Sequence, residues 1–168
     1  MTGRRTIQAT VVAALGLALA SCAAVGDGPL KGSEWGGLTC APVALYPHPA
    51  FGIPLPGDLD ETIAILAVEP IGGHGIEVGS LHLMPVEPAL RTAFVEFPPT
   101  ESFPDAWAHA VPAAGAEVRP GQLVDVVVEL RPDPRGGSFE GLHVLYTAHG
   151  RVHDTTYGMR LDLAESCD

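Results

Sequence analysis

The sequence contains little positive charge, and this scarcity limits the partners that the chain can bind. Its 168 residues include nine Lys and Arg against 20 Asp and Glu, the formal net charge is −11, and Lys31 is the single lysine. A chain this acidic is repelled by the phosphate groups of nucleic acids and by anionic lipid surfaces. We therefore expect no nucleic-acid partner and no adsorption to a membrane by charge alone.

Long apolar segments are also lacking. The apolar run from Ala9 to Ala20 is shorter than the roughly 20 residues that a membrane-spanning helix needs. It follows a basic start that contains Arg4 and Arg5, and small residues come after it, which is the pattern of a secretory signal peptide. Without Arg4 and Arg5 the exported chain keeps seven basic residues against 20 acidic ones, so export makes it still more acidic.

The signal ends in a motif that resembles the lipobox of bacterial lipoproteins in residue types, order and distance from the chain start. The motif consists of Leu19, Ala20, Ser21 and Cys22. The resemblance implies that residues 1–21 are removed and that Cys22 becomes a lipid-carrying N-terminus. It places the remaining chain on the outer face of the cytoplasmic membrane, with general secretion favoured over twin-arginine export. An ordinary signal peptide with a chance cysteine is the alternative.

Cysteine is scarce as well, with three in the chain. If Cys22 carries lipid, Cys40 and Cys167 remain at opposite ends of the following segment. Two such thiols outside the cytoplasm are expected to form a disulfide. Closing a loop of this length contributes up to ~4–5 kcal/mol in the chain-entropy model. Two free thiols are the alternative.

The composition divides the exported chain into two parts. Residues 22–39 comprise the lipidated cysteine and a glycine-rich segment, which predicts a flexible tether. Residues 40–168 form one domain, long enough to bury a core. The domain begins with five prolines in residues 40–58, which disfavour a helix and a central strand and predict an extended arm along the domain edge.

Short apolar segments between Pro/Gly breaks predict β-strands. The first of them is continuously apolar, as in a strand buried on both faces, and the second changes phase at Gly79, as at a β-bulge. Pro120-Gly121 predicts a type II turn before a strand with clear alternation. The predicted strands are Thr62–Val68, Ile76–Met84, Ala93–Phe97, Leu123–Leu130 and a closing hairpin that starts at Leu142.

This pattern predicts an all-β fold, a single immunoglobulin-like antiparallel β-sandwich of about seven strands. Pro120-Gly121, Val124–Val128 and Gly141–Tyr146 together resemble the last three strands of immunoglobulin-like domains in exported bacterial proteins. The stretch from Thr62 to Cys167 resembles small uncharacterised actinobacterial cell-envelope proteins. Neither resemblance implies an activity or a cofactor.

The closing hairpin makes a prediction about register. If His149 and Gly150 are the central residues of a type I′ turn, Tyr146 lies opposite His153 on the core side. His143 then lies opposite Thr156 on the outer face. A loop longer by one residue would place His143 and His153 together.

A metal site is the first chemical hypothesis. His82 and Met84 lie two residues apart on a predicted strand and therefore share a face. Imidazole and thioether ligands suit copper outside the cytoplasm. One such pair needs a further ligand, for which His109 or Met159 is the candidate. The cluster of Asp58, Asp60 and Glu61 could hold Ca²⁺, but it lacks EF-hand spacing and also fits a solvated loop.

Enzymatic chemistry finds no support in the sequence. Ser138 lacks the glycine pattern of a nucleophile elbow, and no cysteine is left to pair with a histidine. We therefore expect a non-enzymatic binding module of the cell envelope, held at the membrane by its lipid, without a cofactor. Its partner would be an envelope protein or a cell-wall component. A copper-binding lipoprotein that uses His82 and Met84 is the alternative.

Overall fold

The computed structural model describes residues 28–88 and 91–167, so the predicted signal peptide and the lipobox with Cys22 lie outside the described residues. The elements, in chain order, are β1 (Ser33–Pro42), the 3-10 turn η1 (Val43–Leu45), β2 (Pro49–Pro54), β3 (Ile63–Ile71), β4 (Ile76–Pro85), β5 (Phe94–Glu96), α1 (Pro104–Trp107), β6 (Val111–Pro112), β7 (Val124–Pro132), β8 (Gly137–Ala148) and β9 (Arg151–Ala164). No helix among the described residues is long and apolar enough to cross a membrane.

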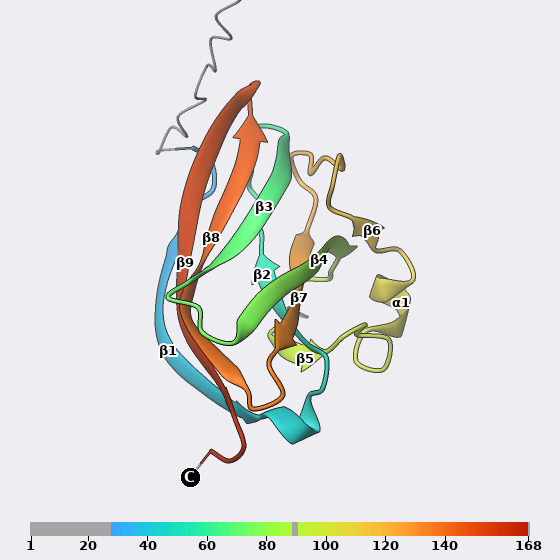
Figure 1. The fold of residues 1–168 in the computed structure, drawn as a ribbon. Helices are drawn as coiled ribbons and strands as arrows, with labels where there is room; N and C mark the ends of the chain where they lie inside the picture. The colour runs from blue at the N-terminus through green and yellow to red at the C-terminus, as the bar shows by residue number, and fades with distance from the viewer. Residues whose placement is uncertain (1–27, 89–90, 168) are drawn as a thin grey trace, which may run out of the picture.

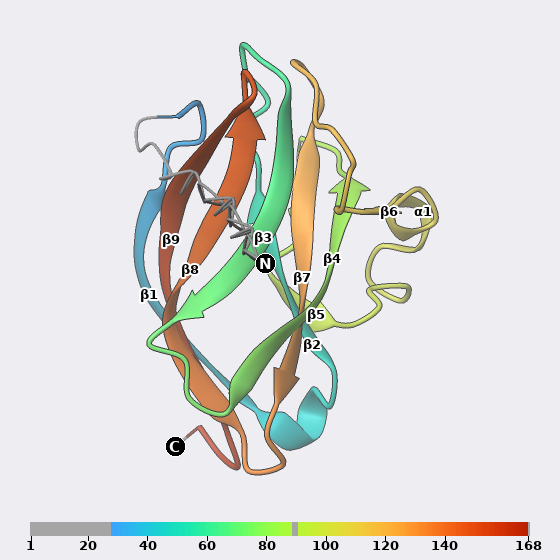
Figure 2. The ribbon, with the colours of Figure 1, turned by 45° about the horizontal axis from the view of Figure 1, so that its top comes forward.

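The strands form an all-β sandwich of two packed sheets. One sheet has the order β1-β9-β8-β3 and the other β5-β2-β7-β4-β6 (Figures 1 and 2). The strands β2, β7 and β4 take the places of B, E and D in immunoglobulin-like domains, and β9, β8 and β3 those of G, F and C. The predicted fold class is therefore confirmed, and the described residues form nine strands rather than about seven. One pairing departs from the antiparallel prediction, because β1 pairs with β9 in parallel.

The core lies between the sheets and follows the alternation of the strands. On β7 the even-numbered residues from Val124 to Leu130 point inward and are buried. Leu142, Val144 and Tyr146 on β8 face them from the other sheet. On the outer face of the β7 sheet, Val127 belongs to a second small cluster with Ala50 and Met84, which is covered by the segment that contains α1.

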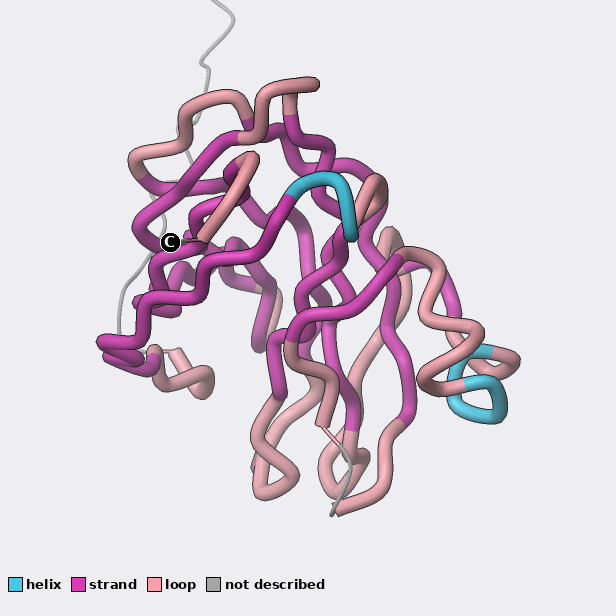
Figure 3. Tube along the Cα trace, turned by 90° about the horizontal axis from the view of Figure 1, so that it is seen from below, coloured by secondary structure: helices cyan, strands magenta, loops and turns pink. Residues whose placement is uncertain are grey.

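The segment around α1 stands outside the two strand layers. It runs from β5 to β6, which pairs with the edge of β4. Figure 3 shows this segment to one side of the strands, with the C-terminal segment at the near end of the sandwich. The helix α1 begins at Pro104, where the missing N–H costs nothing, and ends at Trp107.

Two local predictions from glycine positions are confirmed. The register of β4 against β7 shifts between Val78 and Leu81, so a bulge lies at Gly79. In the closing hairpin, His149 and Gly150 have φ values of 49° and 71°, as a type I′ turn requires. Tyr146 therefore pairs with His153, and the two rings stack with centroids 5.6 Å apart.

The predicted disulfide between Cys40 and Cys167 is present, with an S–S distance of 2.04 Å. It links the end of β1 to the segment that follows β9. Because β1 and β9 are already neighbours in the sheet, the bond fixes two adjacent strands where the chain leaves the sandwich.

The prediction of a flexible tether up to residue 39 is wrong for its last part. Leu30 is buried, with 3% of its surface exposed, and β1 begins at Ser33. The Leu30 backbone N donates to the Tyr146 hydroxyl at 3.3 Å, which fixes this segment on the core. Glycine enrichment did not prevent order here, because β9 offers an unpaired edge on which the segment forms backbone hydrogen bonds.

Two strand predictions also need correction. Residues 40–58 are not merely an edge arm, because β2 lies between β5 and β7. Pro49 and Pro54 stand at the two ends of β2, so its interior residues keep the N–H groups that pairing needs. The strand predicted over Thr62–Val68 is not buried on both faces, since β3 is the edge of its sheet and Leu66 is 53% exposed.

Candidate functional site

A pocket of about 300 Å³ opens between the two sheets, and we call it the inter-sheet pocket. It lies where β1 and β9 of one sheet face β2 of the other. Its walls are formed by the segment before β1, by β2 and by β9, together with the chain that leads into β5. The lining residues are Lys31, Ser33, Phe51, Gly52, Pro54, Pro56, Arg91, Thr92, Ala93, Tyr157, Gly158 and Met159.

The inter-sheet pocket is open on one side because β5 pairs with only the first part of β2. The short strand β5 covers β2 from Pro49 to Phe51, and the Gly52 N–H then donates to the Ala93 carbonyl at 2.9 Å. Pro54 has no N–H to offer, and no strand of the described residues pairs with this edge of β2 beyond that point. Phe51 and Met159 thereby line a space that an additional strand would otherwise close.

The polar groups of the pocket gather at the chain segment before β5. Arg91 donates from Nη1 to Asp125 Oδ1 at 2.9 Å, and the Thr92 backbone N donates to Asp125 Oδ2 at 2.7 Å. Asp125 is fully buried on the outer side of β7, so these two bonds satisfy a charge that water does not reach. They also fix residues 91 and 92 at the rim of the pocket.

Two further polar groups at this wall have no partner within the described part of the chain. The Oγ1 atom of Thr92 is buried and makes no hydrogen bond there. Lys31, at the rim, forms no salt bridge with a described residue. An unpaired buried hydroxyl is uncommon in a folded protein and calls for an explanation.

Tyr157 contributes a neutral phenol to the same pocket. The residue is 7% exposed, and burial, assisted by the neighbouring Tyr146, raises its pKa to about 12. The ring therefore stays uncharged at neutral pH. It adds apolar surface and one polar oxygen to the wall, without a competing negative charge.

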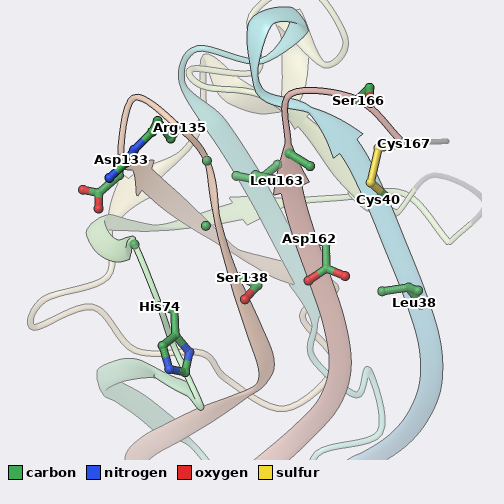
Figure 4. Close-up of a pocket in the computed structure, with 14 residues that line it drawn as sticks. Leu38, Cys40, His74, Asp133, Arg135, Ser138, Asp162, Leu163, Ser166 and Cys167 are labelled. Atoms are coloured by element: carbon green, nitrogen blue, oxygen red, sulfur yellow. A yellow bond between two sulfur atoms is a disulfide. The ribbon is translucent and has the colours of Figure 1, made fainter.

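A larger and more open hollow of about 810 Å³ lies beside the disulfide (Figure 4). Backbone pairing places His74 next to Ser138 and Ser138 next to Asp162, in one row across the strands. Because Ser138 stands between the other two, Asp162 does not orient the imidazole as a catalytic triad requires. This geometry gives Ser138 no activated role.

The two predicted metal ligands on β4, His82 and Met84, share its outer face as predicted and lie beneath the segment that contains α1. His82 lies against Trp107 and Phe97, with ring centroids 4.9 and 5.8 Å away, and its Nδ1 is buried without a partner among the described residues. Burial lowers the His82 pKa, although Glu129 opposes this shift. Met84 is buried in the cluster beneath α1.

The structure places the two candidate third ligands, Met159 and His109, in different surroundings. Met159 belongs to the main core on the other sheet and lines the inter-sheet pocket, so it is not a partner for His82. His109 uses its Nδ1 to bond the Asp105 carbonyl at 2.8 Å. Within residues 28–88 and 91–167 there is no group of three or more His, Cys, Asp or Glu that could hold a metal ion.

The remaining charged candidates form pairs. His143 lies on the outer face, 3.0 Å from Asp154, while His153 stacks on Tyr146 on the core side, so the two histidines are apart as predicted. Glu61, from the suggested calcium cluster, pairs with His149 at 2.8 Å. With Asp58 and Asp60 it lines a separate shallow hollow.

The structure thus defines an all-β sandwich with an apolar pocket between its sheets. Comparisons of the chain with models of protein families, with curated proteins and with solved structures find no match. The sequence-based analysis did not identify Arg91, Thr92 or Tyr157 as site residues. The sequence feature that could have pointed to this pocket is Lys31, the single lysine of an acidic chain.

Proposed function

We propose that this chain is a membrane-anchored extracytoplasmic binding module whose inter-sheet pocket takes an apolar molecule. The observation that carries the proposal is the pocket itself, with walls that are mainly apolar and a few polar groups gathered on one side. Ligand sites in proteins share this composition, and 300 Å³ falls at the lower end of their usual range of about 300–1,000 Å³.

The position of the pocket relative to Cys22 supports this role. Lys31 at the rim is the ninth residue after Cys22, and a chain of this length spans at most ~30 Å. A lipid on Cys22 would therefore hold the pocket close to the bilayer, where apolar molecules are concentrated. The chain is too acidic to approach an anionic membrane by charge, so this proximity depends on the lipid.

The anchor is tested by mass spectrometry of the exported protein. We expect the N-terminal peptide to begin at Cys22 and to carry the mass of added acyl chains. A Cys22→Ser variant is expected to be released from the membrane fraction. An exported protein that begins elsewhere, or whose Cys22 is unmodified, would contradict the anchor but not the pocket.

The pocket is tested with the two methionines that follow the signal peptide. Met159 lines the pocket, whereas Met84 is buried beneath α1 and does not. With methyl-labelled methionine in the full chain, reconstituted in nanodiscs of deuterated phosphatidylcholine, 1-decanol should give intermolecular NOEs to the Met159 methyl and none to Met84. Equal NOEs to both, or none to Met159, would contradict the proposal.

A matched pair of variants blocks the pocket. Ala93 is exposed at the rim, so Ala93→Trp should fill the mouth and abolish the Met159 NOEs. Ala44 is equally exposed but lies in η1, away from the pocket, so Ala44→Trp should leave them unchanged.

A copper-binding module is the second candidate function. The observation that favours it is the buried Nδ1 of His82, which has no partner among the described residues. Burial lowers the His82 pKa and so favours the neutral imidazole, the form that binds metals. Titration with Cu(I) tests it: sub-micromolar binding that is lost in His82→Ala and kept in His143→Ala would support a copper site. Binding that is absent, or unaffected by His82→Ala, would exclude His82 as its centre.

A further inference from the structure

We propose that the ligand of the inter-sheet pocket is a single-chain fatty acid, with its carboxylate at Lys31 and Arg91 and its alkyl chain between the sheets. This inference rests on the proposed function of the pocket and adds the chemistry of the head group. It is argued from the charges at the rim, the donors that face them and the size of the space.

The distribution of charge is the first argument. The chain has 20 acidic residues, yet within its described part no Asp or Glu lines the inter-sheet pocket, while Lys31 and Arg91 do. Carboxylates line the other hollows, such as Asp133 and Asp162 beside the disulfide and Asp105 near α1. In a protein this acidic, a rim with cations alone favours a negatively charged head group.

The net charge at the rim favours a carboxylate over a phosphate. Arg91 is already paired with the buried Asp125, so this pair carries no net charge. Lys31 then supplies a single positive charge, which matches a fatty-acid carboxylate. A phosphate monoester carries about −1.5 to −2 at neutral pH and would remain partly uncompensated.

The hydrogen-bond donors at the rim can serve such a group. The Arg91 guanidinium has five N–H donors, and Asp125 holds it in place through Nη1. The Thr92 hydroxyl is buried and does not face the open space, so the remaining guanidinium N–H groups of Arg91 and the Lys31 ammonium supply the donors. Asp125 thereby acts as a positioning residue for the donors.

The size of the pocket limits the apolar part of the ligand. A space of about 300 Å³ between Phe51 and Met159 admits one alkyl chain and excludes a two-chain phospholipid. Gly158 and Ala93 contribute little or no side chain to the walls, and among the described residues the charged groups that line them are Lys31 and Arg91.

Lys31 also borders the neighbouring hollow that contains Asp58 and Glu61, and these acids compete for its charge. Lys31 forms no salt bridge with either of them, so it is available to a ligand. Measurements at about 0.15 M salt keep the screening length near 8 Å and suppress long-range repulsion by the acidic chain.

The experiment compares three probes of equal chain length: decanoate, 1-decanol and decyl phosphate. Each is titrated into the full chain in phosphatidylcholine nanodiscs, with the Met159 methyl as the reporter and Met84 as the reference. We expect decanoate to bind about tenfold more tightly than 1-decanol, as one charge-assisted hydrogen bond in a partly desolvated site provides.

The Lys31→Met variant is expected to lose this preference for decanoate and to bind 1-decanol as the wild type does. Lys31 is exposed, so the substitution leaves the core intact. Arg135→Met makes the same change in net charge beside the disulfide and should keep the preference.

The outcomes separate the two proposals. Equal affinities for decanoate and 1-decanol, with NOEs to Met159, would overturn the head-group inference and leave the apolar pocket standing. Tighter binding of decyl phosphate than of decanoate would overturn the carboxylate assignment. The absence of Met159 NOEs with all three probes would overturn both proposals, and a preference that survives in Lys31→Met would remove Lys31 from the site.

Discussion

The Glu129 carboxylate satisfies the backbone at the bulge in β4, and this arrangement makes stability depend on pH in a defined way. Ser80 donates to Glu129 Oε2 from its backbone N and from its Oγ, each at 2.7 Å. Arg131 donates from Nε to Oε1 at 2.9 Å. The hydrogen bond from Arg131, with those from Ser80, lowers the Glu129 pKa from 4.5 to about 2, against the opposing effect of burial.

The direction of the effect follows from the lowered pKa in the folded state. The ionised Glu129 stabilises the fold above about pH 4.5, and this contribution is lost as the pH falls from about 4.5 towards 2. A pKa lowered from 4.5 to about 2 corresponds to about 3 kcal/mol at neutral pH. The side chain is 12% exposed, so water screens it only in part. Glu129→Gln keeps the shape, removes the charge and should lower the free energy of unfolding by about 2–3 kcal/mol at pH 7.

The assay is urea unfolding of the wild type and Glu129→Gln at a series of pH values between 2 and 7. The difference between the two free energies cancels the contributions of the other carboxylates. We expect the difference to shrink below pH 4.5 and to vanish near pH 2. Glu101 is exposed in a loop, and Glu101→Gln serves as the control for the same substitution away from the bulge. A Glu129→Gln difference that stays constant with pH would refute the reasoning.

Three further predictions concern covalent and backbone constraints. Replacing Cys40 by Ser should lower the free energy of unfolding by up to ~4–5 kcal/mol in urea titrations, and a loss below ~1 kcal/mol would contradict a stabilising role for the bond. Gly136→Ala should lower it by at least ~2 kcal/mol, because φ is 90° and a Cβ would lie 1.9 Å from the Leu163 carbonyl oxygen; an unchanged melting temperature would contradict this. His149→Gly should raise the free energy of unfolding by roughly 0.5–1 kcal/mol, because glycine adopts the positive φ without strain and this gain exceeds the loss of the exposed pair with Glu61. A lower melting temperature would show that the pair with Glu61 contributes more than the strain costs.

The features that the sequence predicted correctly are encoded by neighbouring residues. The bulge at Gly79 follows from a change of apolar phase within β4, and the type I′ turn follows from Gly150 in the hairpin. The disulfide follows from the number of cysteines and their export. Each of these depends on a short stretch of chain or on a count, so no knowledge of distant contacts was needed.

The errors concern how strands far apart in the sequence pair. Residues 33–39 look like a tether because they are rich in glycine, yet they form hydrogen bonds with the edge of β9, more than a hundred residues later. The prolines of β2 suggested an edge arm, but they stand at its two ends and leave both sides of its interior free to pair. Burial of β3 on both faces was wrong because its place at the edge is a property of the whole sheet.

Asp125 illustrates why the inter-sheet pocket could not be predicted from the sequence either. The alternation of β7 correctly places Asp125 opposite the core, which predicts an exposed side chain. The structure buries it because residues 91 and 92, more than thirty positions earlier, cross the outer face of the sheet and donate two hydrogen bonds to it. That contact fixes Arg91 at the pocket rim, and the Gly52 N–H, which donates to the Ala93 carbonyl, holds the same segment against β2. The charge at the rim, the exposed edge of β2 and the burial of Asp125 are therefore consequences of one long-range arrangement. A variant that disturbs the Arg91–Asp125 pair should alter both stability and ligand binding, whereas Lys31 alters binding alone.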